Sequence, residues 1–559
     1  LAQCGHSDID NMFRHKAAPP LGTQINISSP RQIPQQDMTN GRLLWVDDEI
    51  EHLRAHIIFL RQKGYEVITV SNGTDAIEQC QSQTFNMILL DEMMPGISGL
   101  ETLQKIKEIQ PQTPVVMVTK SEEENIMDQA IGHKIADYLI KPVNPSQILL
   151  TLKKHIHSRE IVAEVTQTQY QQTFSQISAQ ILMCHTLADW KALYRRLVQW
   201  ELTLSETDTG MKEMLDMQRA EANAAFGKFI KQKYLDWVAP KTFLDHSSRP
   251  TLSPDIFRKY IFPLIDSEET PVFFIVMDNL RYDQWTTLSK ELSRDYDIEE
   301  DLYMSILPTA TQYARNAIFS GLMPEKIEKM FPELWVDEDS EEGKNLNEAP
   351  LIQTQIDRFR RHDTFSYNKI YDSEGAERFI NNLPNLVNND LNVLVVNFID
   401  MLSHARTEMK MLRELASDEP AYRSLTLSWF VHSAIADVFK SLAQRRCRIV
   451  ITTDHGSIRT HRPVKIIGDR NTNTNLRYKL GKNLNCQSKD VFTIKSPRDA
   501  QLPVPNISTS YVFATGDTFF AYPNNYNYYV SYYKDTFQHG GISMEEMLVP
   551  IATLSPRLV

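Results

Sequence analysis

The chain has 559 residues, a formal net charge of −12 and 42% hydrophobic residues. This length exceeds what one hydrophobic core usually supports, so about three domains are expected. The acidic balance argues against broad non-specific DNA binding, and no apolar stretch approaches the length of a membrane span. Five scattered cysteines form neither a disulfide framework nor a close metal-ligand pair, which is typical of a reducing compartment. We therefore expect a cytoplasmic protein.

Residues 1–37 show no hydrophobic periodicity and are interrupted by Pro19-Pro20 and Ser28-Ser29-Pro30. They contain no apolar core long enough for a signal peptide. We expect a disordered leader, or a remnant of the expression vector, followed by a native start at Met38.

Residues 38–158 alternate between short β-branched runs and helical stretches. The expected strands are Leu43–Val46, Glu66–Val70, Met87–Leu90, Val115–Val118 and Tyr138–Ile140. Five such strand–helix units in one domain predict a doubly wound parallel sheet with flavodoxin-like strand order.

Residue types that bind metal and phosphate stand at the ends of these strands. Asp47-Asp48 follows the first strand, Asp91 follows the third, Thr119 ends the fourth and Lys141 follows the fifth. Clustered carboxylates favour Mg²⁺, which prefers oxygen ligands. A lysine and a threonine beside them can bind a phosphoryl group that is attached to one carboxylate. The segment resembles the receiver domains of two-component response regulators.

This resemblance implies a role for each of these residues. Three carboxylates hold Mg²⁺ and one of them accepts the phosphoryl group: Asp47, Asp48 and Asp91, with Asp91 as the phosphoacceptor. Thr119 and Lys141 contact the phosphoryl group, and Tyr138 stands at the position of the family's switch aromatic. Lys141-Pro142 is expected to be a cis peptide.

Residues 159–240 contain almost no glycine or proline and have a helical pattern. Trp190, Leu193, Leu197 and Trp200 are spaced as one face of a helix. We expect an all-α bundle of about three helices, with a break near residues 203–208. The apolar stripe predicts packed core, and a dimer seam or a signal-transmitting helix is the alternative.

In residues 241–559, apolar strand-like runs end in acidic or imidazole side chains. The runs are Pro271–Met277, Leu394–Ile399 and Arg448–Thr453, and a separate His-Gly-Gly follows near residue 539. Parallel strands bring their carboxyl ends, and hence their ligands, to one edge of a sheet. Carboxylates and imidazoles gathered there predict a two-zinc site for phosphoryl transfer. The candidate ligands are Asp278, Asp400, His404, Asp454, His455 and His539.

A candidate nucleophile lies between the first two of these ligands. A strand is expected to end at Leu307, and a helix is expected to run from Thr311 to about Gly321. A hydroxyl at a helix N-terminus faces unpaired N–H groups and the positive end of the dipole, and zinc can activate it for attack on phosphorus. Thr311 and Thr309 both follow the strand and are both candidates.

This arrangement resembles the alkaline phosphatase superfamily. The segment 308–322 aligns without gaps on the nucleophile segment of nucleotide pyrophosphatase/phosphodiesterases, which favours Thr311 as nucleophile. Sulfatases carry an arginine at the place of Arg315, which implies a contact with phosphate, although a structural ion pair is the alternative. This chain has Thr311 at the position where sulfatases have a cysteine, so a sulfatase or phosphomutase is disfavoured. Ser403 departs from the phosphodiesterase pattern, which has glycine before the histidine.

By the same resemblance, two zinc ions divide the ligands between them. One ion is bound by Asp400, His404 and His539. The other is bound by Asp278, Asp454, His455 and the Thr311 oxygen. The sequence around these ligands, such as Met277-Asp-Asn-Leu-Arg and Asp454-His-Gly, is most similar to the PglZ branch of the superfamily.

A receiver domain followed by helices and a PglZ domain resembles the PorX-type response regulators of type IX secretion. The resemblance implies a sensor histidine kinase as phosphate donor and secretion-machinery proteins or a sigma factor as partners. We expect phosphorylation of Asp91 to produce a homodimer and to control a zinc-dependent phosphodiesterase. The alternative is a signalling scaffold that binds these partners with a weakly active zinc domain.

Two further features bear on the substrate. Seven basic residues lie between Arg459 and Lys482, and Tyr526, Tyr528, Tyr529, Tyr532 and Tyr533 form a cluster. A basic loop can attract an extended anion and tyrosines can stack on bases. For the basic residues a solvated loop is the alternative, and for most of the tyrosines core or edge-strand packing is favoured over base stacking. Together with a threonine nucleophile, these features favour a nucleotide or oligonucleotide phosphodiester over a small monoester.

Overall fold

The computed structural model describes residues 40–111, 113–120, 135–156, 158–205, 211–239, 249–267, 270–338, 340, 343, 345–416, 418–468, 473–486 and 489–557. The leader expected over residues 1–37 lies outside this range. The chain divides into two compact units, residues 1–158 and 159–559. Among the described helices, none is both long and apolar enough to cross a bilayer.

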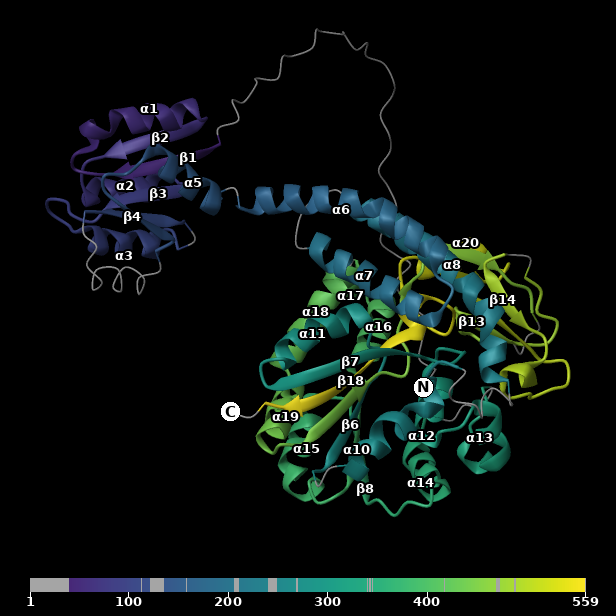
Figure 1. The fold of residues 1–559 in the computed structure, drawn as a ribbon. Helices are drawn as coiled ribbons and strands as arrows, with labels where there is room; N and C mark the ends of the chain where they lie inside the picture. The colour runs from purple at the N-terminus through teal and green to yellow at the C-terminus, as the bar shows by residue number, and fades with distance from the viewer. Residues whose placement is uncertain are drawn as a thin grey trace, which may run out of the picture. The chain divides into compact units, whose positions relative to one another are not determined.

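The first unit contains a five-stranded parallel sheet (Figure 1). Its strands are β1 (Gly41–Val46), β2 (Tyr65–Val70), β3 (Met87–Asp91), β4 (Val115–Thr119) and β5 (Asp137–Ile140). Their order is β2-β1-β3-β4-β5, and every neighbouring pair is parallel. The flavodoxin-like order expected from the sequence is confirmed.

Side chains alternate between the two faces of this sheet, as a parallel sheet covered on both faces requires. Leu43 and Trp45 belong to one apolar core, and Leu44 and Val46 belong to the other. The helices that cover these faces are η1 (Ile50–Leu53), α1 (Arg54–Gln62), α2 (Gly73–Ser82), α3 (Gly99–Ile109) and α5 (Pro145–Ile156). The carboxyl ends of the strands therefore meet at one edge, where the acidic residues stand.

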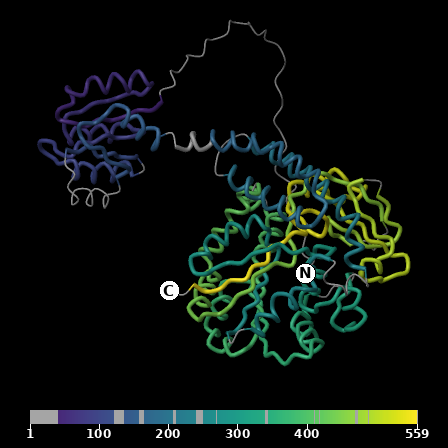
Figure 2. Tube along the Cα trace, in the orientation of Figure 1, coloured from purple at the N-terminus to yellow at the C-terminus, as the bar shows by residue number. Residues whose placement is uncertain are grey.

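The second unit begins with three long helices: α6 (Ser158–Met183), α7 (Leu187–Ser205) and α8 (Lys212–Val238). Trp190, Leu193 and Leu197 are buried, and Trp200 packs on the same core, so the predicted helix face is confirmed. This core continues into the C-terminal domain, against which the helices run (Figure 2). The backbone N–H of Leu307 also donates to the Tyr234 hydroxyl of α8 at 2.8 Å.

The C-terminal domain is an α/β sandwich around a six-stranded sheet. The strand order is β7 (Tyr296–Met304), β18 (Leu548–Pro556), β10 (Arg448–Thr452), β6 (Val272–Met277), β9 (Leu391–Val396) and β8 (Phe365–Ile370). The last four are mutually parallel, whereas β18 is antiparallel to both of its neighbours. Figure 1 shows α11 (Tyr282–Leu292), α15 (Ser373–Leu386) and α19 (Ala434–Gln444) on one side of the sheet, and α12 (Thr311–Ser320) and α14 (Glu348–Arg358) on the other.

Shorter elements complete this domain. Before and between the central strands lie η2 (Ser253–Asp255), η3 (Phe257–Ile261), α10 (Phe262–Ser267), α13 (Pro324–Met330), η4 (Pro332–Leu334), α16 (Phe398–Glu408), α17 (Lys410–Leu415) and α18 (Glu419–His432). After β10 lie β11 (Ile458–Arg459), β12 (Arg462–Lys465), β13 (Tyr478–Gly481), β14 (Val491–Ile494), η5 (Pro497–Ala500), β15 (Ser510–Ala514), β16 (Thr518–Ala521), α20 (Tyr526–Tyr533), β17 (Phe537–Gln538) and α21 (Met544–Met547). Small sheets pair β11 with β17, β12 with β16, and β15 with both β13 and β14.

The expectation for the tyrosine cluster is wrong. The sequence favours core or edge-strand packing for most of these residues. They form helix α20, which has no buried residue. Rings four residues apart stack on each other in this helix, with centroids 6.2 Å apart for Tyr528–Tyr532 and for Tyr529–Tyr533, and this local packing suits helical spacing.

Candidate metal centre

Three adjacent parallel strands, β10, β6 and β9, bring the predicted ligands of the C-terminal domain together. Asp278 directly follows β6, and Asp454 and His455 follow β10. One expectation needs correction, because the strand before Asp400 ends at Val396 and not at residue 399. Asp400 instead lies in the first turn of α16, so that Asp400 and His404 share one helix face at spacing i, i+4.

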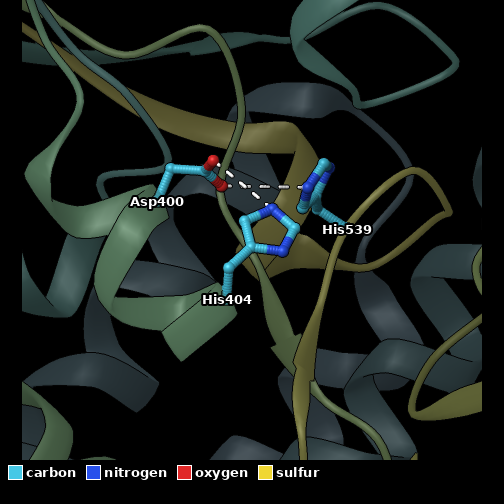
Figure 3. A group of neighbouring side chains, drawn as sticks. All are labelled: Asp400, His404 and His539. Carbon is cyan, nitrogen blue, oxygen red and sulfur yellow. Dashed lines mark ion pairs between the residues drawn. The ribbon is translucent and has the colours of Figure 1, made fainter. Parts of the chain in front are cut away.

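The first group of candidate ligands is Asp400, His404 and His539, drawn in Figure 3. The Asp400 carboxylate faces both imidazoles: its oxygens lie 3.4 Å from His404 Nε2 and 3.9 Å from His539 Nε2. The His404 side chain is 65% exposed, so this group opens to solvent.

The second group is Asp278, Asp454 and His455, and all three are buried. His455 Nε2 lies 3.9 Å from Asp278 Oδ1 and 3.8 Å from Asp454 Oδ2. The His455 ring stacks on the His539 ring of the first group, with centroids 4.2 Å apart. The two groups therefore adjoin, as a centre for two metal ions requires.

The hydrogen bonds of the His455 and His539 imidazoles show that these residues fit metal ions. Nδ1 of His455 faces the Gly456 carbonyl at 3.1 Å, and Nδ1 of His539 faces the Thr309 carbonyl at 3.1 Å. Each Nδ1 must therefore donate, which leaves an Nε2 lone pair directed at carboxylates. Burial, together with His455, lowers the pKa of His539 to about 3, which keeps this ring neutral. A lone pair that faces carboxylate oxygens is stabilised by a cation between them.

A buried carboxylate oxygen supports the same conclusion. Within the described part of the chain, Asp278 Oδ1 is buried and has no hydrogen-bond partner. Burial raises the pKa of Asp278 well above its ordinary value, and Asp454 and Asp400 add to this, although Arg315 opposes it. Such a carboxylate is costly to keep ionised in isolation, and a bound divalent cation would offset that cost.

Arg315 forms the structural ion pairs that the sequence offered as the alternative to a phosphate contact. Its guanidinium is fully buried and contacts Asp278, Asp454 (Nε–Oδ2, 3.1 Å) and Glu348 (Nη1–Oε1, 3.3 Å). A contact between Arg315 and phosphate stays a prediction. Arg315 positions two of the ligand carboxylates, and Glu348 in turn holds Arg315. No sequence signal pointed to Glu348, which is brought close only by the packing of α14 on α12.

The two threonine candidates have different surroundings. Thr311 is the first residue of α12, is half-buried, and its Oγ1 lies 3.1 Å from His455 Nε2. Thr309 is fully buried, and its hydroxyl donates to the Gly541 carbonyl at 2.9 Å and accepts from Gly540 N–H at 3.0 Å. The Thr311 hydroxyl therefore faces the candidate ligands, whereas Thr309 holds the loop that follows His539.

A second acidic cluster stands at the carboxyl edge of the sheet in the first unit. Asp47, Asp48 and Asp91 each offer a carboxylate oxygen to one point. Lys141 Nζ lies 2.8 Å from both Asp47 Oδ2 and Asp91 Oδ2. Burial raises the pKa of Asp91, and this effect outweighs the opposing hydrogen bond from Lys141. The cluster fits an Mg²⁺ ion bound by oxygen ligands.

Two other predicted residues flank this cluster. The Thr119 hydroxyl donates to the Glu92 carboxylate. Tyr138 is 42% exposed, so its ring lies largely outside the domain core. The expected cis peptide between Lys141 and Pro142 is present.

Several basic residues of the loop after β10 form ion pairs or hydrogen bonds within the domain. Arg477 is fully buried against Glu546, and buried Lys479 donates to the Asn473 carbonyl at 2.8 Å. Arg462 pairs with Asp517 at 2.6 Å. Arg470 lies outside the described residues. The hypothesis that this loop attracts an anion is therefore wrong for Arg477 and Lys479, which stabilise the fold instead.

Comparison with protein families divides the chain into three parts. The model for the BREX system PglZ alkaline phosphatase-like domain matches residues 256–554. The model for the PorX response regulator linker domain matches residues 160–238, and that for the response regulator receiver domain matches residues 43–153.

Among curated proteins, the transcriptional regulatory protein ZraR of Klebsiella oxytoca is 35% identical over 127 residues, which is 22% of this chain and 29% of ZraR. The alkaline phosphatase synthesis transcriptional regulatory protein PhoP of Bacillus subtilis is 29% identical over 169 residues, covering 30% of this chain and 69% of PhoP. The chain thus spans about a third of the length of its ZraR relatives. A solved CheY-like receiver domain from Methanospirillum hungatei is 28% identical, with a TM-score of 0.21, over 21% of this chain and 95% of that one.

Proposed function

The chain belongs to the PglZ family of alkaline phosphatase-like domains, and on that premise we propose that its C-terminal domain is a zinc-dependent phosphodiesterase. Receiver, PorX linker and PglZ domains follow one another in the PorX-type order that the sequence predicts. The proposed zinc ligands are Asp400, His404 and His539 for one ion, and Asp278, Asp454, His455 and the Thr311 oxygen for the other. Zinc is favoured over Mg²⁺ here because each group contains imidazole.

The observation that carries this proposal is the position of the Thr311 hydroxyl. It lies at the N-terminus of α12, 3.1 Å from His455 Nε2 and beside the paired ligand groups. When bound, zinc supplies Lewis-acid stabilisation of phosphoryl oxygens and lowers the pKa of a coordinated hydroxyl. The positive end of the α12 helix dipole favours negative charge at the same place. Thr311 is therefore the proposed nucleophile.

The other residues of the centre hold its geometry. Backbone carbonyls fix the rings of His455 and His539 so that each Nε2 faces inward. Arg315 keeps Asp278 and Asp454 close to each other despite their like charge. This support is the kind that orients metal ligands in proteins.

A diester is favoured over a monoester as substrate. A monoester carries an additional negative charge near neutral pH, which requires a further cation beside the metals. Arg281 and Arg315 are not available for this, since Arg281 pairs with Asp283 at 2.8 Å and Arg315 pairs with three carboxylates. We therefore propose nucleotides or oligonucleotides as substrates, cleaved at a phosphodiester.

We further propose that the receiver domain controls this activity. A sensor histidine kinase would phosphorylate Asp91, where Mg²⁺ bound by Asp47, Asp48 and Asp91, together with Lys141, would stabilise the phosphoryl group. Thr119 would then turn from Glu92 toward the phosphoryl group and Tyr138 would move inward. The expected result is a homodimer in the cytoplasm that acts in type IX secretion, with secretion-machinery proteins or a sigma factor as partners.

The test is hydrolysis by the purified full chain with zinc added or removed by a chelator. We expect zinc-dependent cleavage of methyl p-nitrophenyl phosphate and of a dinucleotide, with slower cleavage of p-nitrophenyl phosphate. Thr311→Ala should lose turnover while it keeps zinc and the wild-type melting temperature. Equal turnover in wild type and Thr311→Ala, or wild-type activity unaffected by zinc, would overturn the proposal.

A further inference from the structure

Helix α20 carries an exposed aromatic surface that the proposed mechanism does not use. Tyr528 is 65% exposed and Tyr529 is 39% exposed. Their rings stack nearly parallel on Tyr532 and Tyr533, at interplanar angles of 17° and 10°. Together with Tyr526 these residues form a tyrosine ladder along the helix. Tyr528 and Tyr529 are the exposed members of this ladder.

Two cations from other elements lie over this ladder. Lys465 Nζ of β12 is 4.7 Å from the ring centroid of Tyr526, and Arg413 Cζ of α17 is 5.5 Å from that of Tyr532. The ladder is therefore both aromatic and locally positive, in a chain whose formal net charge is −12. Aromatic faces flanked by cations suit ligands that combine aromatic rings with negative charge, such as single-stranded nucleic acid.

The ladder is joined to the metal centre by a short paired segment. Strand β11, which follows His455, pairs with strand β17, which precedes His539, at Ile458–Gln538 and Arg459–Phe537. The Thr536 hydroxyl donates to the Tyr533 carbonyl at 2.6 Å, which fixes the end of α20 to this segment. The three residues from His539 to Thr536 span about 10 Å in an extended strand. The end of the ladder at Tyr533 is therefore separated from His539 by only a short stretch of chain.

A second connection comes from the helix that carries His404. Arg406 Nη1, two residues beyond His404, donates to the Asp535 carbonyl at 2.8 Å. Arg413 of the next helix then reaches Tyr532. Helices α16 and α17 thus both contact the segment Tyr532–Asp535 at the end of α20.

We propose that the tyrosine ladder binds the bases of a single-stranded oligonucleotide whose scissile phosphodiester lies at the metal centre. This inference rests on the proposed function and adds the element that recognises the substrate. Tyr528 and Tyr529 stack on bases beyond the cleavage site, and Lys465 and Arg413 face the adjoining phosphates. Because the ladder binds bases beyond the cleaved bond, oligonucleotides of several residues bind more tightly than dinucleotides.

The test compares substrates with and without distal bases. Tyr528→Ala/Tyr529→Ala should raise KM for a hexanucleotide between about fivefold and a hundredfold, because base stacking on an aromatic side chain contributes on that order. Turnover of methyl p-nitrophenyl phosphate should stay unchanged, and Tyr528→Phe/Tyr529→Phe should behave as wild type. The matched control is Tyr371→Ala, a 55% exposed tyrosine with Lys369 Nζ 5.7 Å from its ring centroid.

Binding of a labelled hexanucleotide, followed by fluorescence anisotropy, provides a readout that needs no turnover. An unchanged hexanucleotide KM and affinity in the double alanine variant would overturn the inference, as would an equal loss in Tyr371→Ala. A protein partner on α20 would give that same unchanged affinity. Failure of the proposed function is separate, because wild type would then not cleave methyl p-nitrophenyl phosphate.

Discussion

Arg423 offers the sharpest test of how the long helices are joined to the catalytic domain. Its Nη1 lies 2.8 Å from Glu201 of α7 and 2.8 Å from Asp283 of α11, and all three side chains are buried. Burial alone would raise the pKa of Asp283, but Arg281 and Arg423 outweigh it and hold that pKa well below its usual range. Arg423→Met would leave two buried carboxylates with one arginine fewer.

The expected magnitude follows from these contacts. Removing one partner of a buried ion pair costs about 3–5 kcal/mol. The lower end, about 3 kcal/mol, applies here, because Glu201 keeps Arg219 at 3.1 Å and Asp283 keeps Arg281 at 2.8 Å. The unit 159–559 has about 400 residues, for which the unfolding entropy is about 0.8 kcal/mol/K. The melting temperature of this unit should therefore fall by about 4 °C.

Differential scanning calorimetry of the full chain measures this shift. The matched control is Arg378→Met, which removes a pair of equal length, 2.8 Å to Glu374, whose side chains are 68% and 76% exposed. That change should cost less than about 1 kcal/mol. Because the folded pKa of Asp283 is lowered, its contribution exists above its unfolded pKa and is lost as pH falls, so the effect of Arg423→Met should shrink below about pH 4. Equal shifts in the two variants would refute the reasoning.

Three other substitutions test particular contacts. Thr309→Ala removes two buried hydrogen bonds to backbone groups and should lower the free energy of unfolding by about 1–3 kcal/mol. It should retain some turnover, unlike Thr311→Ala. If Thr309→Ala alone were completely inactive, the roles of the two threonines would be reversed. On addition of a phosphoryl analogue, light scattering should show that the molecular mass doubles for wild type and stays unchanged for Asp91→Ala. A dimer that forms regardless of Asp91 would contradict the proposed control. In Gly456→Ala, the new Cβ would lie 2.1 Å from the Glu545 carbonyl oxygen. This clash should lower the free energy of unfolding by about 3 kcal/mol and reduce the amount of bound zinc. Wild-type stability in chemical denaturation would show that the backbone can move to relieve the clash.

The sequence predicted those parts of the fold that are set by local pattern. Strands such as β3 and β6 are buried along their whole length, and a continuous apolar run bounded by polar residues marks such strands clearly. The ligand residues followed, because an acidic residue after such a run stands at the carboxyl edge of the sheet. The boundary after β9 was less accurate because Ile399, in helix α16, is fully buried and prolongs the apolar run.

Contacts between distant parts of the chain could not be predicted in this way. From the sequence alone, Arg477 is predicted to be a loop cation. In the structure its guanidinium pairs with Glu546, which lies 69 residues later in the chain. Arg315 likewise pairs with Glu348 across two packed helices. The partner of a buried charge depends on tertiary packing, whereas periodicity reports only which face a residue occupies.

The most direct test of the central claim is the zinc content of the purified full chain, measured by elemental analysis after exposure to zinc and removal of the excess. Two adjoining ligand groups predict two zinc ions per wild-type chain. They predict about one for Asp400→Ala/His404→Ala, which disrupts only the solvent-exposed group. Wild-type protein without zinc, or a double variant that still binds two ions, would contradict a zinc centre built from these residues.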